Sequence, residues 1–307
     1  NKGVAIVYIS HRMEEVFAHC DTITVMRDGY AISSKPPRET NMEQVVRDMV
    51  GRSITEYYPG RTNEPGEIVL EVKNFCQDGL FNNISFKLRK GEILGVAGLM
   101  GAGRTEIMRA LFGVDSCKHG EVYLHGKKVC IKKPEDAIKA GIGFITENRK
   151  SEGLILDFSI SRNIALPSVD TFAKRSVINA KNETAFSEAL SKKLGVKTAS
   201  IDLEAGALSG GNQQKVVIAK WIGMNPSIII MDEPTRGIDV GAKRDIYDLM
   251  NELTSQGVAI IMVSSELPEV IGMSDRILVI HEGKIAGELD HEEATQEKII
   301  TLATGGQ

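Results

Sequence analysis

A glycine-rich stretch, Gly98-Leu99-Met100-Gly101-Ala102-Gly103-Arg104-Thr105, follows a predicted buried strand and opens a predicted helix. Glycines in such a turn let backbone N–H groups surround a polyphosphate, and the positive end of the following helix points at the same charge. The Thr105 hydroxyl is placed to ligate Mg²⁺. The P-loop pattern has Lys where this chain has Arg104, and a planar, bidentate guanidinium need not make the same phosphate contact. The residues of this stretch predicted to bind the cofactor are Gly98, Gly101, Ala102, Gly103, Arg104, Thr105 and Glu106.

A second stretch is an apolar run that ends in two carboxylates, Asp232 and Glu233. The β-branched residues before them are typical of a buried parallel strand. Asp232 is predicted to hold a metal ion through water, and Glu233 to polarise an attacking water. Because ligands lie at the carboxyl ends of strands in open α/β sheets, we expect this pair close to the glycine-rich stretch.

The third stretch, Leu208-Ser209-Gly210-Gly211-Asn212-Gln213-Gln214-Lys215, opens a predicted helix that runs through Trp221. Ser209 with Gly210 and Gly211 at a helix N-terminus forms another anion site. Two phosphate sites in one small domain are more than one nucleotide needs. That excess is explained if the second site serves a nucleotide held by a different domain.

Strands and helices alternate around these stretches, which predicts an α/β fold with a mainly parallel sheet. Two alternating strands and a hairpin at His125-Gly126 predict an antiparallel β subdomain. The insertion between that hairpin and Ser209 is expected to form a second, mainly helical subdomain. Strands are predicted at 68–72, 83–88, 92–96, 121–124, 128–131, 227–231, 258–263 and 276–281, and helices at 104–111, 134–140, 179–195, 241–256 and 266–272.

An internal repeat organises the chain. Residues 3–29 align without gaps on 257–283 at an offset of 254, and 11 of the 27 positions are identical, including Ser10/Ser264 and Glu15/Glu269. About two identities would be expected by chance at ordinary composition. We therefore expect residues 1–53 to be the tail of one copy, beginning with a strand at Val4–Ile9, residues 54–67 to be a linker, and residues 68–307 to be a complete second copy. The parent protein is then expected to be a tandem duplication.

The composition excludes several classes. The formal charge of 37 minus 41, or −4, gives no support for a broad nucleic-acid-binding surface. The longest apolar run, Val258–Val263, is too short to span a membrane. No signal peptide and no CxxC pair are present, so the thiols are predicted to be reduced and the chain cytosolic. The cysteines are Cys20, Cys76, Cys117 and Cys130.

In this order, the three motifs resemble those of the ATP-binding-cassette ATPases. The sequence from Asp232 to Gly241, with the Asn-Gln-Gln after Leu-Ser-Gly-Gly and the duplication, is similar to the fused ATPase subunit of bacterial simple-sugar importers of the ribose and galactose type. The resemblance covers the whole chain and implies a P-loop NTPase core. It also implies a head-to-tail sandwich, in which each ATP lies between one cassette's glycine loop and the other's Ser209–Gly211 motif. Asp239 would communicate between the two sites.

The resemblance further implies the cofactors ATP and Mg²⁺, with Thr105 and Asp232 as the metal-binding side chains. The expected activity is ATP hydrolysis coupled to monosaccharide import. The expected partners are another ATP-binding cassette, transmembrane permease subunits and a periplasmic or lipid-anchored sugar-binding protein, with no nucleic acid. The chain would then be peripheral, on the cytoplasmic face of the membrane. The sequence does not identify the sugar.

The departures from the family pattern concern the second copy's own site. The family's switch histidine matches His11 in the first-copy tail, where it would be catalytic, but the repeat offset places Ser265 in the second copy. A glutamate, Glu147, stands near the position of the usual glutamine and can still coordinate metal. Together with Arg104, these changes suggest a degenerate second site, and we expect weak or absent turnover in the isolated chain. An adenine-stacking aromatic before the glycine loop is expected to be Phe75 or Phe81.

Two other functions stay open. One is a non-transport cassette protein acting on ribosomes or DNA, although the linker of about fifteen residues is short for that class. The other is a regulatory cassette that binds ATP without hydrolysing it. Glu233 favours retained activity, whereas Arg104 and Ser265 argue against it.

Overall fold

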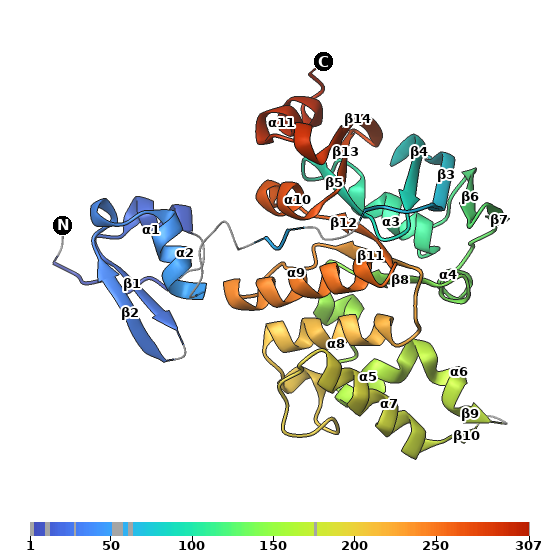
Figure 1. The fold of residues 1–307 in the computed structure, drawn as a ribbon, viewed down its shortest axis with the longest axis horizontal. Coiled ribbons are helices and arrows are strands. Elements are labelled where there is room, and N and C mark those ends of the chain that lie inside the picture. The colour runs from blue at the N-terminus through green and yellow to red at the C-terminus, as the bar shows by residue number, and fades with distance from the viewer. Residues whose placement is uncertain are drawn as a thin grey trace.

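A computed structural model describes residues 3–9, 13–27, 29–50, 58–60, 64–174 and 177–306 of the chain. Its centre is a six-stranded sheet of order β14-β13-β5-β12-β11-β8, parallel except for the antiparallel edge strand β14 (Figure 1). The strands are β5 (Ile93–Gly98), β8 (Ile142–Ile145), β11 (Ile228–Asp232), β12 (Ala259–Val263), β13 (Arg276–His281) and β14 (Lys284–Asp290).

The central strands are continuous apolar runs because helices cover the sheet. Every residue of β11 and β12 is buried. The covering helices are α3 (Arg104–Phe112), α4 (Pro134–Lys139), α9 (Val240–Ser255), α10 (Leu267–Met273) and α11 (Gln296–Ala303). The predicted α/β class with a mainly parallel sheet is confirmed. Across the described ranges, no helix has both the length and the apolarity to cross a membrane.

A four-stranded antiparallel sheet of order β4-β3-β6-β7 forms the predicted β subdomain. Along β4 the buried residues Phe81, Ile84, Phe86 and Leu88 are separated by exposed ones, as expected for a sheet with one covered face. The strands are β3 (Ile68–Gln77), β4 (Phe81–Arg89), β6 (His119–Leu124) and β7 (Lys127–Val129).

A helical lobe lies at the lower end of the molecule in Figure 1. It contains α5 (Ile160–Ala165), α6 (Val169–Phe172), α7 (Ala180–Lys193), α8 (Gly210–Ile222) and the short hairpin β9 (Ala173–Lys174) and β10 (Val177–Ile178). The expectation that the whole insertion forms this lobe is wrong in one respect, because α4 and β8 belong to the core. Strand β8 is only four residues long and contains Gly143, so it has little strand signal of its own.

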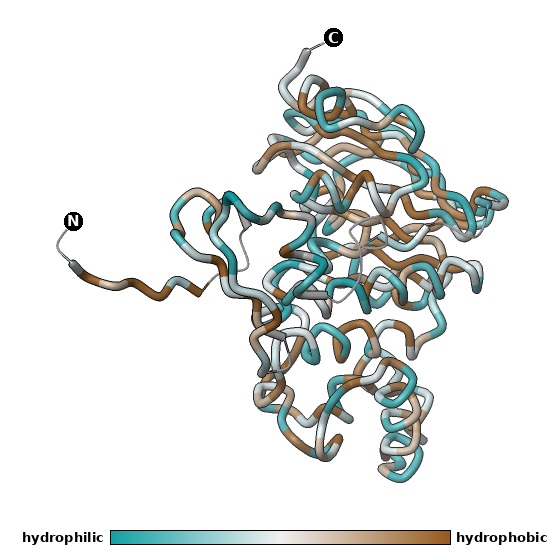
Figure 2. Tube along the Cα trace, turned by 60° about the vertical axis from the view of Figure 1, so that its left-hand side comes forward, coloured by the Kyte–Doolittle hydropathy of each residue, from teal (hydrophilic) through white to brown (hydrophobic). Residues whose placement is uncertain are grey.

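The N-terminal part has a small apolar cluster of its own, formed by Val16, Ile23, Val25 and Val45. Its elements are α1 (Met13–His19), β1 (Ile23–Arg27), β2 (Tyr30–Lys35) and α2 (Met42–Val50). The strand expected at Val4–Ile9 is wrong. That segment pairs with no strand in the described part of the chain, and Figure 2 shows it as a brown, hydrophobic stretch projecting from the rest. An extended apolar segment becomes a strand only when a neighbour takes its backbone hydrogen bonds.

The described residues of the predicted linker lie against the cassette core. The Tyr58 ring sits over Gly272 of α10, where a Cβ would lie 2.4 Å from a ring carbon. The same ring packs on Tyr247 at a centroid distance of 5.3 Å. The Asn251 side chain donates a hydrogen bond to the Pro59 carbonyl at 3.1 Å. This part of the linker is therefore held by α9 and α10.

Candidate functional site

Three adjacent strands bring the predicted site residues to one edge of the sheet. Strand β12 lies between β5 and β11, and all three run parallel, so their carboxyl ends meet. The glycine loop continues from the end of β5, and Ser264 and Ser265 follow β12. Asp232 is the last residue of β11, and Glu233 follows it. The expectation that the carboxylates lie close to the glycine loop is confirmed.

The glycine loop depends on backbone conformations that other residues resist. Gly98 has φ +155°, and a Cβ there would lie 2.4 Å from the Ile280 carbonyl oxygen. Gly103, at φ +98°, immediately precedes α3. Gly101 also has a positive φ of +77°, but a Cβ there would meet no atom within 4 Å. The loop therefore needs its first glycine for close packing and its later ones for backbone direction.

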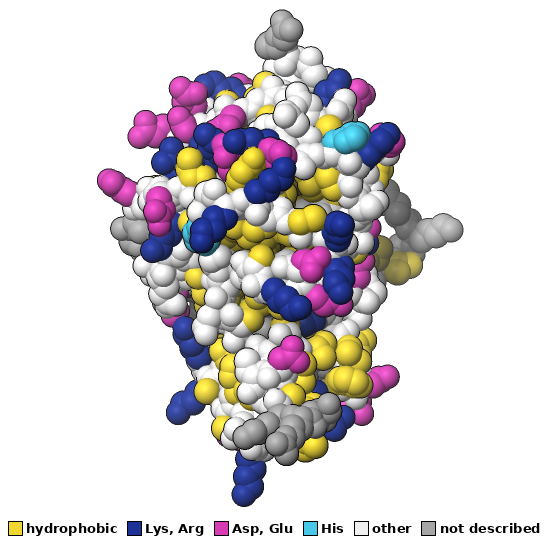
Figure 3. Space-filling model, turned by 90° about the vertical axis from the view of Figure 1, so that its right-hand side faces the viewer, with side chains coloured by type: hydrophobic (Ala, Val, Ile, Leu, Met, Phe, Trp, Pro, Cys, Tyr) yellow, Lys and Arg dark blue, Asp and Glu magenta, His cyan; other side chains and the backbone are white. Residues whose placement is uncertain are grey.

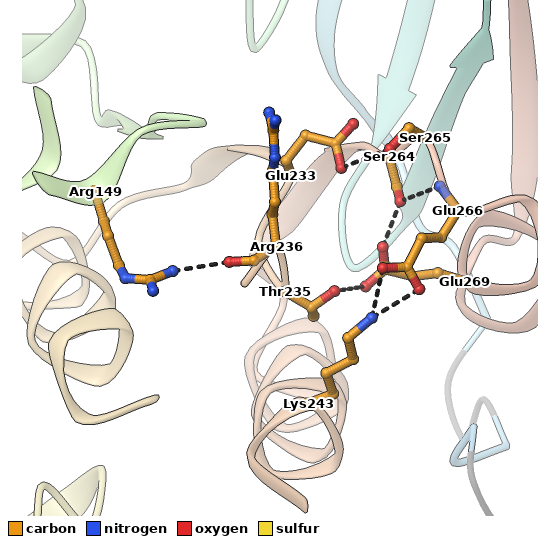
Figure 4. A network of polar contacts seen from close by, with 9 residues as sticks. All are labelled: Arg149, Glu233, Thr235, Arg236, Lys243, Ser264, Ser265, Glu266 and Glu269. Carbon is orange, nitrogen blue, oxygen red and sulfur yellow. Dashed lines mark hydrogen bonds and ion pairs between the residues drawn. The ribbon is translucent and has the colours of Figure 1, made fainter. Parts of the chain in front are cut away.

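Arg104 lies across the end of β12. Its guanidinium donates a hydrogen bond to the Ser264 carbonyl at 2.8 Å and pairs with one carboxylate oxygen of Glu233 at 4.0 Å. The Ser265 hydroxyl donates to the other Glu233 oxygen at 3.2 Å (Figure 4). Arg104 and Ser265 therefore each contact one carboxylate oxygen of Glu233, and we call these three side chains the Glu233 clamp.

Asp232 is the buried last residue of β11. In the described part of the chain, neither of its carboxylate oxygens has a hydrogen-bond partner. Burial raises the pKa of Asp232 to about 6, and the nearby Thr105 hydroxyl and Arg104 guanidinium offset only part of that rise. A buried carboxylate with open acceptor sites beside a helix-start hydroxyl fits a divalent cation of the Mg²⁺ type. Glu106 lies in the same helical turn and adds negative charge.

Glu233 follows directly in a strained conformation. Its φ of +50° is unusual for a residue with a side chain, and its N–H donates to the Val263 carbonyl at 2.8 Å. Burial raises the pKa of its carboxyl above the ordinary value. Strain of this kind concentrates at functional sites, where the surrounding structure enforces it.

A buried carboxyl group joins the two loops behind the site. Glu269 of α10 accepts a hydrogen bond from the Thr235 hydroxyl at 2.7 Å and another from the Ser264 hydroxyl (Figure 4). Burial raises the pKa of Glu269. Sequence reasoning assigned no role to this network, although Ser264 and Glu269 both fall on identities of the internal repeat, which was the available signal.

The Ser209–Gly211 motif begins α8 and packs on the start of α9. A Cβ on Gly211 would lie 3.0 Å from the Cβ of Ala242, and the Asp239 carboxylate accepts a hydrogen bond from the Ala242 N–H at 2.9 Å. The structure thus brings the motif together with Asp239. The nearest atoms to a Cβ on Gly210 or Gly211 come from Arg149, Gly237, Ile238, Asp239 and Ala242, and none belongs to the glycine loop.

Glu147 lies in the loop after β8, where its carboxylate pairs with the Arg236 guanidinium. Two residues further on, Arg149 begins a π-helical turn, and its guanidinium reaches the backbone of residues 236 and 237. Sequence reasoning did not name Arg149 or Arg236, because nothing in their local pattern shows that these two loops meet.

The aromatic candidates for adenine stacking are both buried. Phe75 and Phe81 stack on each other with ring centroids 5.5 Å apart. Leu80 is 46% exposed, and its carbonyl oxygen would lie 3.3 Å from a Cβ on Gly103. The backbone at Leu80 therefore lies beside the glycine loop, while the rings of Phe75 and Phe81 are packed in the interior. The remaining site prediction, His11, lies outside the described residues.

This fold and this arrangement of loops define an ATP-binding cassette. Residues 81–236 match the family model described as "ABC transporter", which is slightly more than half of the chain. The chain belongs to the ABC transporter family, and the resemblance drawn from the motifs is confirmed.

The chain is similar to proteins named "Ribose import ATP-binding protein RbsA". It is 63% identical to the one from Oceanobacillus iheyensis and 62% identical to the one from Bacillus subtilis strain 168. Each alignment covers 305 residues and 99% of this chain. The chain spans about 62% of the length of these relatives.

Solved structures show the same fold at lower identity. The ADP conformation of MJ1267, an ATP-binding cassette of an ABC transporter, is 22% identical with a TM-score of 0.66, covering 78% of this chain and 99% of that one. The dimeric post-hydrolysis state of the cassette MJ0796 bound to ADP and Pi is 22% identical with a TM-score of 0.62, covering 72% and 98%. These likenesses confirm the cassette fold with its antiparallel β subdomain.

Proposed function

We propose that the chain is part of the ATP-binding subunit of an importer for a simple sugar, with ribose as the substrate. The observation that carries this proposal is the 63% identity to a ribose import ATP-binding protein across 99% of the chain. The subunit works peripherally on the cytoplasmic face of the membrane, with transmembrane permease subunits and a periplasmic or lipid-anchored sugar-binding protein. Residues 1–53, 54–67 and 68–307 are its first-cassette tail, linker and second cassette.

The geometry of the sheet edge supports ATP and Mg²⁺ as ligands. Backbone N–H groups of the glycine loop and the start of α3 would donate to the phosphates. Thr105 and the open carboxylate oxygens of Asp232 would hold Mg²⁺, which would neutralise phosphate charge. Glu233 is the carboxylate that would act as a general base on water.

The Glu233 clamp supports a second cassette with a degenerate site of its own. A carboxylate engaged on both oxygens by Arg104 and Ser265 is less available to accept a proton from water. This cassette's main role is then to complete the nucleotide site of another cassette through Ser209–Gly211 and Asp239. Such pairing is supported by the dimeric state named for MJ0796. The same clamp also favours the alternative of a cassette that senses ATP without hydrolysing it.

A partner at the membrane is supported by the surface of the helical lobe. Figure 3 shows hydrophobic side chains gathered toward the lower end of one face, where the lobe lies. Exposed apolar side chains that gather in this way mark interaction surfaces. The exposed hydrophobic residues of the lobe include Ile155, Phe158, Leu166 and Leu203.

The decisive experiment measures Mg-ATP binding and hydrolysis by the purified chain, with Glu233→Gln as the control. We expect binding in both proteins and turnover in neither. Turnover that the Gln variant abolishes would show that Arg104 and Ser265 are tolerated, and would contradict the degenerate site.

A second experiment tests the substrate. The whole importer reconstituted in vesicles should show ATP hydrolysis stimulated by ribose and its binding protein. Absence of any stimulation would contradict the ribose assignment.

A further inference from the structure

Two loops on different strands of the core sheet are tied together by one guanidinium. Arg149, in the loop after β8, donates a hydrogen bond to the Arg236 carbonyl at 2.8 Å (Figure 4). It donates a second one to the Gly237 carbonyl at 3.1 Å. Residues 236 and 237 lie in the turn that joins Glu233 to Asp239. A forked donor on two successive carbonyls fixes both the position and the direction of that turn.

A second contact joins the same two loops, but here the guanidinium comes from the turn after β11 and its partner from the loop after β8. The Glu147 carboxylate, two residues before Arg149, pairs with the side chain of Arg236. Arg236 is therefore held by two contacts. Its guanidinium pairs with Glu147, and its carbonyl accepts a hydrogen bond from Arg149. The side chains of Glu147 and Arg236 are 40% and 61% exposed, so this ion pair alone contributes little stability.

The two contacts lie directly beside the Ser209–Gly211 motif. A Cβ on Gly210 would be 2.7 Å from an Arg149 guanidinium nitrogen and 3.4 Å from the Gly237 carbonyl oxygen. Gly210 thus leaves the space that the Arg149 side chain fills. Any shift of the guanidinium changes what the first turn of α8 packs against.

Arg149 occupies a costly position for a cation. The side chain is half-buried, burial lowers its pKa, and its buried Nε has no hydrogen-bond partner in the described ranges. Arginine keeps its charge under these conditions, whereas a lysine has no planar fork with which to reach two carbonyls. The position therefore depends on guanidinium geometry more than on charge.

We propose that Glu147, Arg149 and Arg236 form a brace that sets where the Ser209–Gly211 motif and Asp239 lie relative to the core. Arg149 is its central positioning residue. The brace rests on the proposed function, in which this motif and Asp239 complete a nucleotide site held by another cassette.

The first test measures amide hydrogen exchange on the purified chain. In Arg149→Lys we expect exchange at residues 210–212 and 236–240 to rise at least tenfold, while β3 and β6 are unaffected. The matched control is Arg162→Lys, on an exposed arginine of α5 in the helical lobe. Unchanged exchange at both segments in Arg149→Lys would overturn the brace, whatever the activity of the protein.

The second test uses the full-length tandem protein and separates kcat from KM for Mg-ATP. Arg149→Lys, Glu147→Arg and Arg236→Glu should each lower kcat about tenfold. Arg149→Lys and Arg236→Glu should change KM less than twofold, because the glycine loop is untouched. The charge-reversed pair Glu147→Arg with Arg236→Glu should recover most of the loss. A kcat of the double variant no higher than that of the single variants, or a wild-type kcat in Arg149→Lys, would overturn the brace.

Failure of the proposed function gives a different result, because the wild-type protein itself would then neither bind nor hydrolyse Mg-ATP.

Discussion

Asp232 illustrates how one residue can oppose folding and serve binding. Its carboxyl is buried without a hydrogen-bond partner among the described residues, and its pKa is raised to about 6 from 3.8. Between these pH values the native state holds more protons than the unfolded state. Ionisation of Asp232 therefore lowers the free energy of unfolding as the pH rises from about 4 to about 6, and this loss remains at higher pH.

We therefore predict that Asp232→Asn stabilises the nucleotide-free chain. At pH 7.5 the free energy of unfolding should rise by about 1–3 kcal/mol, the equivalent of part or all of the pKa shift. At pH 3, where the carboxyl is mostly neutral in both the native and the unfolded state, the gain should vanish. Urea denaturation at both pH values measures it. An equal gain at both pH values would show that the cause is not ionisation, and no gain would show that the carboxylate is better solvated than its burial indicates.

Because both Arg104 and Ser265 contact Glu233, we predict that ATP turnover rises only when both residues are replaced. In Arg104→Lys the Ser265 contact on Glu233 remains, and in Ser265→His the Arg104 contact remains, so neither variant alone should give measurable ATP turnover by the chain. The double variant should raise turnover at least tenfold, and adding Glu233→Gln should abolish the gain. Single-turnover hydrolysis with saturating Mg-ATP is the measurement. Equal gains from each single variant would show that the contacts are independent.

At the scale of elements, the glycine loop depends on close contact between β5, β13 and the start of α3. We predict that Gly98→Ala lowers the free energy of unfolding by more than about 3 kcal/mol, because its Cβ would lie 2.4 Å from the Ile280 carbonyl oxygen. Gly101→Ala is the matched control. Its φ is also positive but its surroundings are open, so it should cost only about 1–2 kcal/mol. Urea denaturation of both variants gives the comparison, and similar losses would show that backbone strain alone controls the loop.

Which elements could be predicted from sequence follows from the range of the interactions that make them. The loop between β5 and α3, the strand ending at Asp232 and the helix after Ser209 depend on local patterns, so their positions were predicted closely. Strand β8 is short and contains a glycine, and it exists because β11 offers it a partner. Arg149 and Glu269 carry no local signal. Their partners lie 87 and 34 residues away, and only the folded chain brings them together.

At the scale of the whole molecule, the linker contact with α10 distinguishes the two copies of the repeat. Gly272 lies beneath the Tyr58 ring, and the repeat offset of 254 places Ala18 at the corresponding position of the first copy. A methyl group at this point would collide with the ring. The first-copy tail could therefore not hold a tyrosine in the same way.

We predict that Gly272→Ala releases the linker without unfolding the cassette. Cleavage within residues 51–66 by a dilute protease should become at least fivefold faster, while α10 itself gains up to about 1 kcal/mol from the helix preference of alanine. Gly66→Ala is the control, because its Cβ would make only ordinary contacts at 3.5–3.6 Å. Unchanged cleavage in Gly272→Ala would show that the Tyr58 ring is not what holds the linker.

The contact of Tyr58 and Pro59 with α9 and α10 also changes how often the segments before and after the linker meet. A free tether of this length would let its two ends sample a broad volume, and their effective concentration would follow from chain statistics. Because Tyr58 and Pro59 are fixed to α9 and α10, whatever precedes Tyr58 is tethered to the cassette at that point and is confined to a smaller volume beside it. Lengthening the linker would then weaken intramolecular encounters only if the residues were inserted before Tyr58, and insertion after Pro59 would first have to break this contact.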